Sequence, residues 1–298
     1  MATHGEESSQ KVKRSVSYSQ YSVYKQCPHR WYLDYAKGLR ENKPSIHLIF
    51  GTALHETLQH YLKVMYDVSA AEADKIDLPA YFKDRLKQLY KENSTAGHFS
   101  TSQELSEFYE DAVAILDYVK RKRNLYFKKK NTTLVGIEVP ISGPVTEAVQ
   151  SIGMKGFIDL ILYDKVTGKY TIYDIKTSTK GWSDYEKKDQ VKVNQILLYK
   201  RFFSVLRKVP EDKIDVQFFI VRRRINENLE FIPKRVQEFI PAHGTGKVNK
   251  AIEDLQAFVH EAFTSEGEYR EKIYPKNVDK CKYCPYIDRR DLCDRKNK

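Results

Sequence analysis

Two strand-like runs joined by a short turn constrain the fold of this chain more than any other feature. The runs cover residues 155–163 and 169–177, and both are rich in β-branched and aromatic residues. Between them, residues 164–168 read Asp-Lys-Val-Thr-Gly, which is the composition of a tight turn. The sequence therefore predicts an antiparallel hairpin.

The predicted hairpin carries two aspartates and a lysine. With the turn centred on its middle residues, Asp159 lies opposite Asp174. A register shifted by two residues places Asp159 opposite Lys176 instead. Because side chains alternate along a strand, Asp174 and Lys176 share one face. Either register gathers two carboxylates and one ammonium group.

This combination of charges has a chemical use. Two carboxylates opposed on a strand pair repel each other, and a divalent cation removes that cost. Oxygen ligands suit Mg²⁺ or Mn²⁺, which can activate water and stabilise charge on a phosphodiester. Lys176 can position the water or neutralise the charge that develops on phosphorus. The alternative is a surface hairpin whose charged side chains simply face solvent.

The remaining periodicity predicts a mixed α/β protein. Helical spacing of apolar residues is found over residues 17–27, 50–66, 79–92, 103–129, 189–207 and 248–264. Further strand-like runs cover residues 133–141 and 214–221. We expect a disordered lead-in over residues 1–14 and one domain over residues 15–298. Its parts are a helical region at about 50–130 and a catalytic core at about 131–225.

Further polar residues flank the hairpin in the sequence. His55 lies in a predicted helix with Gly51 one turn ahead of it, and Gln195 and Tyr199 share a helix face. The ordered set from His55 to Tyr199 resembles the RecB-like branch of the PD-(D/E)XK nucleases. This branch includes AddB-type subunits and CRISPR-associated exonucleases, and the resemblance extends from about Ser17 to Cys293.

The resemblance implies a restriction-endonuclease-like fold, with a central mixed sheet flanked by helices, and a role for each residue. The implied metal ligands are His55, Asp159, Asp174 and the backbone carbonyl of Ile175. Lys176 would be the catalytic lysine, and Gln195 and Tyr199 would orient the DNA strand or the hydrogen bonds of the site. Glu56 ranks below His55 because it points elsewhere on the helix.

Four cysteines stand at the two ends of the chain, at positions 27, 281, 284 and 293. Four thiolates can bind zinc or an iron–sulfur cluster, and buried free cysteines are the third possibility. The resemblance implies a [4Fe–4S] cluster held by Cys27, Cys281, Cys284 and Cys293. Such a cluster would act as a clasp that restricts the unfolded chain, as a long-range disulfide does.

The charge balance favours a polyanionic partner. The chain has 51 Lys and Arg against 40 Asp and Glu, giving a formal net charge of +11. Clustered cations beside aromatic residues suggest contacts with DNA. These candidate contacts are Arg30, Trp31, Tyr32, Lys128, Lys129, Lys130, Arg222, Arg223 and Arg224.

These observations predict a DNA nuclease that requires Mg²⁺ or Mn²⁺. The resemblance implies an exonuclease acting on single strands or DNA ends, in recombination, repair, replication or viral genome processing. The alternatives are a structure-selective endonuclease and a catalytically idle DNA-end-binding subunit beside a helicase. No apolar run reaches the ~18 residues of a membrane span, so we expect a protein of the bacterial cytoplasm or an infected host cell.

Overall fold

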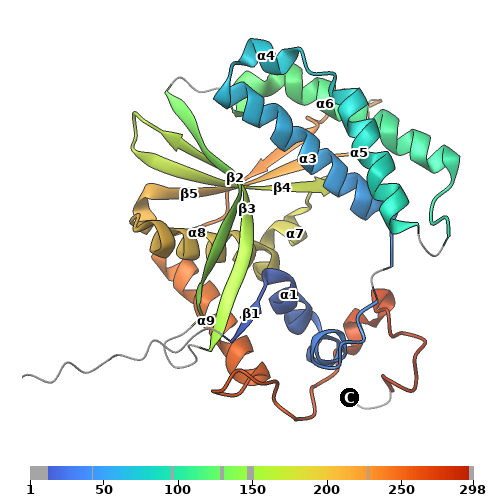
Figure 1. Ribbon diagram of the computed structural model, residues 1–298, viewed down its shortest axis with the longest axis vertical. Helices are drawn as coiled ribbons and strands as arrows, with labels where there is room; N and C mark the ends of the chain where they lie inside the picture. Colours follow the sequence, from blue (N-terminus) through green and yellow to red (C-terminus); the bar gives the residue numbers. More distant parts are fainter. Residues whose placement is uncertain are drawn as a thin grey trace, which may run out of the picture.

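The computed structural model describes residues 13–41, 43–94, 97–127, 131–145, 151–226 and 228–294. Within them, six strands form one mixed sheet (Figure 1). The strands are β1 (Arg14–Val16), β2 (Thr132–Pro144), β3 (Ile152–Asp164), β4 (Lys169–Ser178), β5 (Ile214–Arg222) and β6 (Val236–Phe239). The order along the sheet is β1-β3-β4-β5-β6, and β2 pairs with β3.

Helices cover both faces of the sheet. The N-terminal helices are α1 (Tyr18–Gln26), α2 (Pro28–Trp31), α3 (Ile46–Asp67), α4 (Ala70–Asp74), α5 (Leu78–Asn93) and α6 (Ser102–Tyr126). The later helices are α7 (Asp184–Lys188), α8 (Gln190–Arg207) and α9 (Thr245–Ala262). Short π- and 3₁₀-helical turns cover Tyr32–Ala36, Glu211–Lys213 and Val278–Tyr283.

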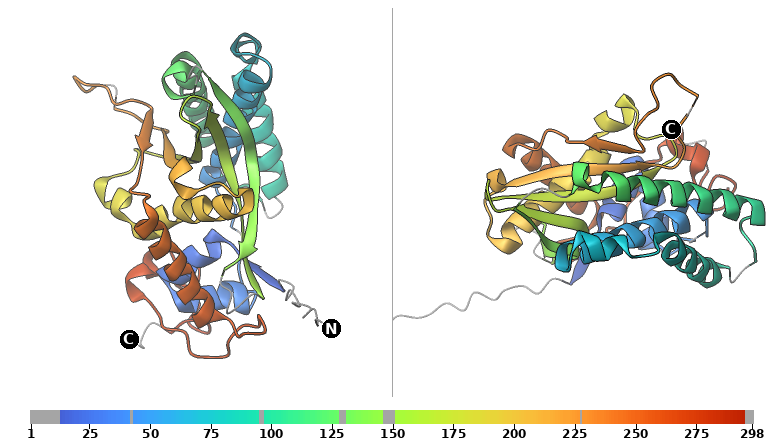
Figure 2. Two further views of the ribbon diagram at one scale, coloured as in Figure 1. Left: turned by 90° about the vertical axis from the view of Figure 1, so that its left-hand side faces the viewer. Right: turned by 90° about the horizontal axis from the view of Figure 1, so that it is seen from above.

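The buried apolar residues form two cores. Helices α3, α5 and α6 pack on one side of the sheet and make one core with β4 and β5. Helices α1, α8 and α9 make the other core on the opposite side. The two groups of helices are seen apart from each other in Figures 1 and 2. The predicted mixed sheet flanked by helices is therefore confirmed.

The predicted elements are found, with altered boundaries. The side chain of Ser45 caps α3 by accepting a hydrogen bond from the His47 amide, so this helix begins at Ile46, before the predicted residue 50. Strands β1 and β6 were not predicted because three or four residues are too few to show alternation.

The predicted lead-in requires one correction. Arg14 was expected to be disordered, but it begins β1, which pairs parallel with β3. Residues 1–12 of that predicted lead-in lie outside the described residues. Among the described residues, no helix has both the length and the apolar character needed to cross a bilayer.

Candidate active site

The β3–β4 hairpin has the register in which the turn is centred on its middle residues. Pairing runs from Asp164 and Lys169 to Leu160 and Tyr173, and it stops one residue before Asp159 meets its partner strand. Beyond that point, β4 continues in parallel pairing with β5. The two aspartates therefore lie where β3 and β4 separate.

A side-chain hydrogen bond takes over where the main-chain ladder ends. Asp159 Oδ2 accepts a hydrogen bond of 2.6 Å from the amide of Ile175. This bond fixes the Asp159 carboxylate beside β4. Burial, together with the nearby Asp174 carboxylate, raises the pKa of Asp159 well above its usual range. Ionised Asp159 is therefore unfavourable in this site unless positive charge is brought near it.

Asp174 is the most deeply buried acid of the site. Its side chain is 1% exposed, and Lys176 Nζ lies 2.9 Å from its Oδ2. Oδ1 accepts the hydrogen bond from the same ammonium group, whereas buried Oδ2 has no hydrogen bond of good geometry. A buried carboxylate with an incompletely satisfied oxygen fits a position that binds a cation.

Lys176 is held in its charged form. Burial acts to lower its pKa, but the Asp174 and Asp159 carboxylates outweigh burial, and the net pKa is raised. The ammonium group is therefore available to balance negative charge at neutral pH.

His55 reaches the site from α3. A Cβ at Gly51 would lie 3.1 Å from Thr177 Oγ1, so glycine lets the helix approach β4 closely. His55 Nε2 then lies 3.6 Å from Asp159 Oδ2. Burial lowers the pKa of His55 despite the acids around it. The imidazole is therefore neutral at pH 7, as a metal ligand must be.

Glu138 on β2 is a site residue that sequence reasoning missed. Its Oε1 lies 3.7 Å from His55 Nε2. The ligand atoms of His55, Glu138 and Asp159 all lie within 4.8 Å of one another, and this group could hold a metal ion. Asp174 is not part of that closest group. Glu138 stands in an ordinary strand-like run, so no local sequence signal marks it.

Glu56 lies outside the site, as expected from its direction on the helix. Its carboxylate is paired with Arg85 of α5, with Arg85 Nη2 2.9 Å from Glu56 Oε1. This ion pair joins α3 to α5 and leaves His55 as the residue of this turn that faces the sheet.

Gln195 and Tyr199 lie together on α8. Gln195 Nε2 donates a 3.1 Å hydrogen bond to the Tyr199 hydroxyl. The Tyr199 ring packs against Gly156 of β3, where a Cβ would lie 3.1 Å from Cε1. Burial raises the pKa of Tyr199, so its hydroxyl stays protonated. The pair is thus fixed beside the strand that carries Asp159.

A cleft of about 750 Å³ opens beside Lys176 and Gln195. Its walls combine cations with aromatic side chains. The lining cations are Lys25, Lys176, Lys188, Lys192 and Lys280, and the aromatic residues are Tyr18, Trp182 and Tyr185. Tyr185 is 79% exposed. Lysines and exposed aromatic rings are the groups that bind phosphates and stack on bases.

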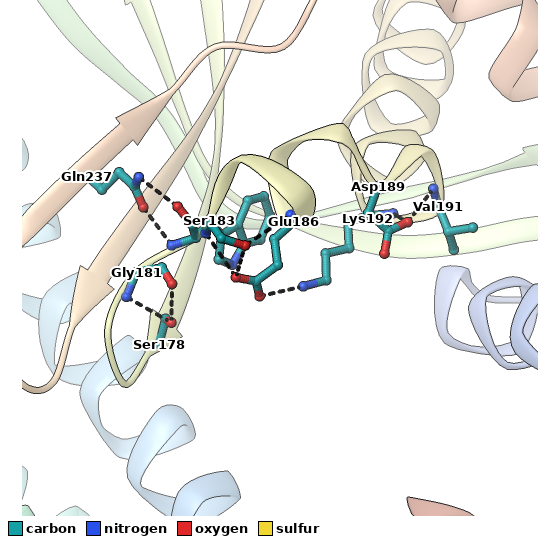
Figure 3. Close-up of polar contacts among 9 residues, drawn as sticks. Ser178, Gly181, Ser183, Glu186, Asp189, Val191, Lys192 and Gln237 are labelled. Carbon is teal, nitrogen blue, oxygen red and sulfur yellow. Dashed lines mark hydrogen bonds and ion pairs between the residues drawn. The ribbon is translucent and has the colours of Figure 1, made fainter. Parts of the chain in front are cut away.

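The loop that carries this wall is held by its own hydrogen bonds (Figure 3). Ser183 and Glu186 form a reciprocal capping box at the start of α7. Glu186 also accepts a 2.9 Å hydrogen bond from Lys192 Nζ. Gln237 of β6 accepts a hydrogen bond from the Trp182 amide and donates one to its carbonyl. The wall of the cleft is therefore fixed to both α8 and the sheet.

The four cysteines meet at one small cavity, although they come from opposite ends of the chain. Cys27, Cys281, Cys284 and Cys293 all line it. They are partly buried and free of disulfides. Burial raises the pKa of the Cys284 and Cys293 thiols. Among the described residues, the tightly spaced ligand group is the one around Asp159, and the cysteines do not form such a group.

Of the predicted DNA contacts near the N-terminus, Trp31 requires correction, whereas Arg30 and Tyr32 are partly buried. Trp31 is fully buried among aromatic side chains that include Phe258 and Phe263, so it packs in the core and cannot stack on a base. Arg30 pairs with Asp34 at 3.4 Å and lines the cysteine cavity. Tyr32 is partly buried and stacks on Tyr274, with ring centroids 5.0 Å apart.

The three consecutive arginines after β5 have different environments. Arg223 is 6% exposed, pairs with Asp111 at 2.6 Å and stacks on Phe108, so it is structural rather than a DNA contact. Arg222 and Arg224 line a separate surface hollow beside Lys180. The predicted contacts Lys128, Lys129 and Lys130 lie outside the described residues.

Comparisons with known proteins agree with this geometry. No curated protein matches the chain. One similar solved structure is a crystal structure from Eubacterium rectale that is provisionally described as an exonuclease. The match has a TM-score of 0.52 and 12% sequence identity, and it covers 100% of this chain and 97% of the other. At this identity the likeness concerns the fold. The family model of the PD-(D/E)XK nuclease superfamily matches residues 15–293, and the chain therefore belongs to this superfamily of metal-dependent nucleases.

Proposed function

We propose that this nuclease hydrolyses DNA phosphodiesters and acts on single strands or DNA ends. The observation that carries the proposal is the convergence of three elements on one point. Helix α3 brings His55 to within 3.6 Å of Asp159 on β3, and Asp159 is bonded to β4 beside Asp174 and Lys176. These four residues, which come from α3, β3 and β4, therefore lie together at one place.

The residues of the site divide the chemistry between them. His55, Asp159 and Asp174 would hold a divalent cation, which would polarise the phosphodiester and lower the pKa of a bound water. Lys176 remains charged and can balance the negative charge that grows on the phosphate oxygens. Gln195 and Tyr199, which are hydrogen-bonded to each other, would orient the DNA strand or the hydrogen bonds of the site. The backbone carbonyl of Ile175 would complete the set of metal ligands.

The composition of the cleft supports a single strand as substrate. Its lysines can follow a phosphate backbone, and the exposed ring of Tyr185 offers a stacking surface for a base. Stacking requires a base face that no neighbouring base covers, and a duplex offers such a face only at its ends. Direct competition with an uncut duplex would measure this preference.

We also propose that the four cysteines hold a [4Fe–4S] cluster. A single zinc ion has sulfur ligands at about 2.3 Å, which places them about 3.8 Å apart in a tetrahedron. The four thiols surround one cavity but are not spaced as tightly as the ligands of one ion. This wider arrangement fits a cluster better than a single ion. When bound, a cluster would link the two ends of the chain covalently.

End-labelled DNA tests the nuclease proposal directly. Purified protein is incubated with linear single-stranded, linear double-stranded and closed circular single-stranded DNA, in Mg²⁺, Mn²⁺ or chelator. We expect metal-dependent loss of the linear single strands, whereas the circles should stay intact. Cleavage of the circles would identify an endonuclease. Binding without cleavage in either metal would identify an idle DNA-binding subunit.

A further inference from the structure

Glu138 on β2 lies opposite Asp159 on the neighbouring strand β3. On either side of it, Ile137 pairs with Leu160 and Val139 pairs with Ile158. Two like charges at opposed positions of a strand pair repel each other. Unless a cation or a strong donor lies between them, this placement of two carboxylates is unfavourable.

A β-bulge produces this placement. The register of β2 against β3 shifts by one residue between Leu134 and Gly136. Without the shift, Ile137 would face Asp159, and Glu138 would be displaced from it. Bulges recur beside active sites because they redirect a side chain.

The backbone of Glu138 is itself unusual. Its φ is +49°, in the left-handed region that residues other than glycine rarely adopt. At this residue β2 passes from one core to the other, since Ile137 packs with the α3 side and Val139 with the α8 side. Strained backbone of this kind is concentrated at functional sites. Here it accompanies the carboxylate that approaches His55.

Three atoms converge on one point next to Glu138, and all three are acceptors when the proton of His55 is on Nδ1, the tautomer that leaves Nε2 free for a metal. Gln59 Nε2 lies 2.8 Å from His55 Nε2, 2.6 Å from Glu138 Oε1 and 3.1 Å from the main-chain oxygen of Asp159. An amide nitrogen carries only two hydrogens, so it cannot satisfy all three acceptors. At least one of these acceptors is therefore left without a hydrogen from Gln59.

We propose that Glu138 is a ligand of the divalent cation bound at His55 and Asp159. Ligands at about 2.1 Å from an octahedral ion lie about 3 Å apart when adjacent and about 4.2 Å apart when opposite. The 3.6 Å and 3.7 Å separations from His55 Nε2 fall between these values. Small side-chain adjustments would therefore complete the coordination, with Gln59 released from Glu138.

The charge balance supports the same assignment. When all three carboxyls are ionised, as bound metal ligands are, Glu138, Asp159 and Asp174 supply three negative charges and Lys176 one positive charge, which leaves two negative charges. One divalent cation neutralises this remainder. The assignment rests on the proposed function, because it concerns the metal of the nuclease site, but it adds a ligand that the predicted set lacks.

Binding of Mn²⁺ without DNA tests the assignment independently of catalysis. Isothermal titration calorimetry, with the electron paramagnetic resonance of free Mn²⁺ as a second readout, is applied to the parent, Glu138→Gln, Asp159→Asn and Glu56→Gln. We expect Glu138→Gln to weaken binding at least about tenfold, the lower limit for losing even an outer partner of a metal ligand. Glu56→Gln is the matched control, since Glu56 is bonded to Arg85 away from the site.

The variants separate the possible outcomes. Glutamine at position 138 can still accept the hydrogen bond from Gln59, so a purely structural role for Glu138 predicts parental Mn²⁺ affinity. That result, with weakened binding in Asp159→Asn, would overturn the assignment and leave the nuclease proposal intact. A parent that binds no Mn²⁺ would overturn both. Circular dichroism of each variant establishes that it is folded.

Discussion

At the scale of single residues, the charge state of each site group follows from its neighbours. Asp174 and Lys176 lie two residues apart on β4 and form a buried ion pair, which keeps the lysine charged. Asp159 accepts the amide hydrogen bond of Ile175, but burial, followed by the nearby Asp174 carboxylate, raises its pKa.

Removing the lysine charge is expected to abolish cleavage. Lys176→Met keeps the length of the side chain but leaves Asp174 without its counter-ion and the reacting phosphate without a cation. We expect the rate of DNA hydrolysis to fall by about 100-fold or more. Lys169→Met is the control, because Lys169 lies on the same strand but pairs with Asp215. If Lys176→Met and Lys169→Met both cleave DNA at the rate of the parent protein, Lys176 has no catalytic role.

Removing the Asp159 charge is expected to stabilise the metal-free protein. The folded-state pKa of Asp159 is raised above its unfolded value of about 3.9, so ionisation at neutral pH opposes folding. Asp159→Asn should therefore raise Tm in chelator at pH 7 by roughly 2 °C or more. Below pH 3.9 the carboxyl is protonated in both states, and the difference should vanish. A lower Tm at pH 7 would contradict this reading of the site.

At the scale of elements, the site is built where secondary structures end or separate. Strands β3 and β4 part after Leu160 and Tyr173, and this opening lets the Asp159 carboxylate reach the Ile175 amide of β4. Helix α3 closes in through Gly51, and α8 presents Gln195 beside the cleft. Short α7 is fixed by its capping box and by Lys192, so the cleft wall has a defined shape.

Helix α7 provides a test of the DNA path. Tyr185 is exposed and lines the cleft, so Tyr185→Ala should leave folding unchanged. Loss of one stacked base should weaken binding of a fluorescent single-stranded oligonucleotide by about 5- to 100-fold. Tyr283→Ala is the matched control, because Tyr283 is 83% exposed and does not line the cleft. Comparable affinities would place the single strand elsewhere.

At the scale of the whole molecule, the two ends of the chain are joined. The Asn277 amide side chain donates to the Gln26 carbonyl, and the Tyr286 hydroxyl donates to buried Asp34. These contacts surround the cavity that the four cysteines line. The proposed cluster would add a covalent link at this place, and a link between residues so far apart in sequence would restrict the unfolded chain.

Breaking the cysteine clasp is expected to affect stability more than chemistry. Cys281→Ser should lower Tm by several degrees and remove the visible absorbance of a bound cluster, since one of four thiolates is lost. Lys282→Ser changes an exposed neighbour and should do neither. Iron and sulfide analysis of the parent measures the cluster itself. If the parent protein is colourless and contains zinc, the four cysteines bind a single zinc ion and the cluster proposal is wrong.

The sequence determined much of the site because its chemistry is local. The turn at Asp164–Gly168 limited the hairpin to two registers, of which the structure has the centred one, and strand alternation placed Asp174 and Lys176 together. Helical periodicity located α3, α5, α6, α8 and α9 to within a few residues. Each of these patterns depends on neighbours in the chain, so it is legible before folding.

The tertiary structure alone decided the features that depend on distant partners. Glu138 joins the site only through the bulge in β2, and Trp31 enters the core only because aromatic residues from the far end of the chain enclose it. Arg223 is neutralised by Asp111 of α6. Burial and ion pairing are set by residues far away in sequence, and no local pattern records them. For this reason the sequence indicated more of the candidate site than of the surface that would bind DNA.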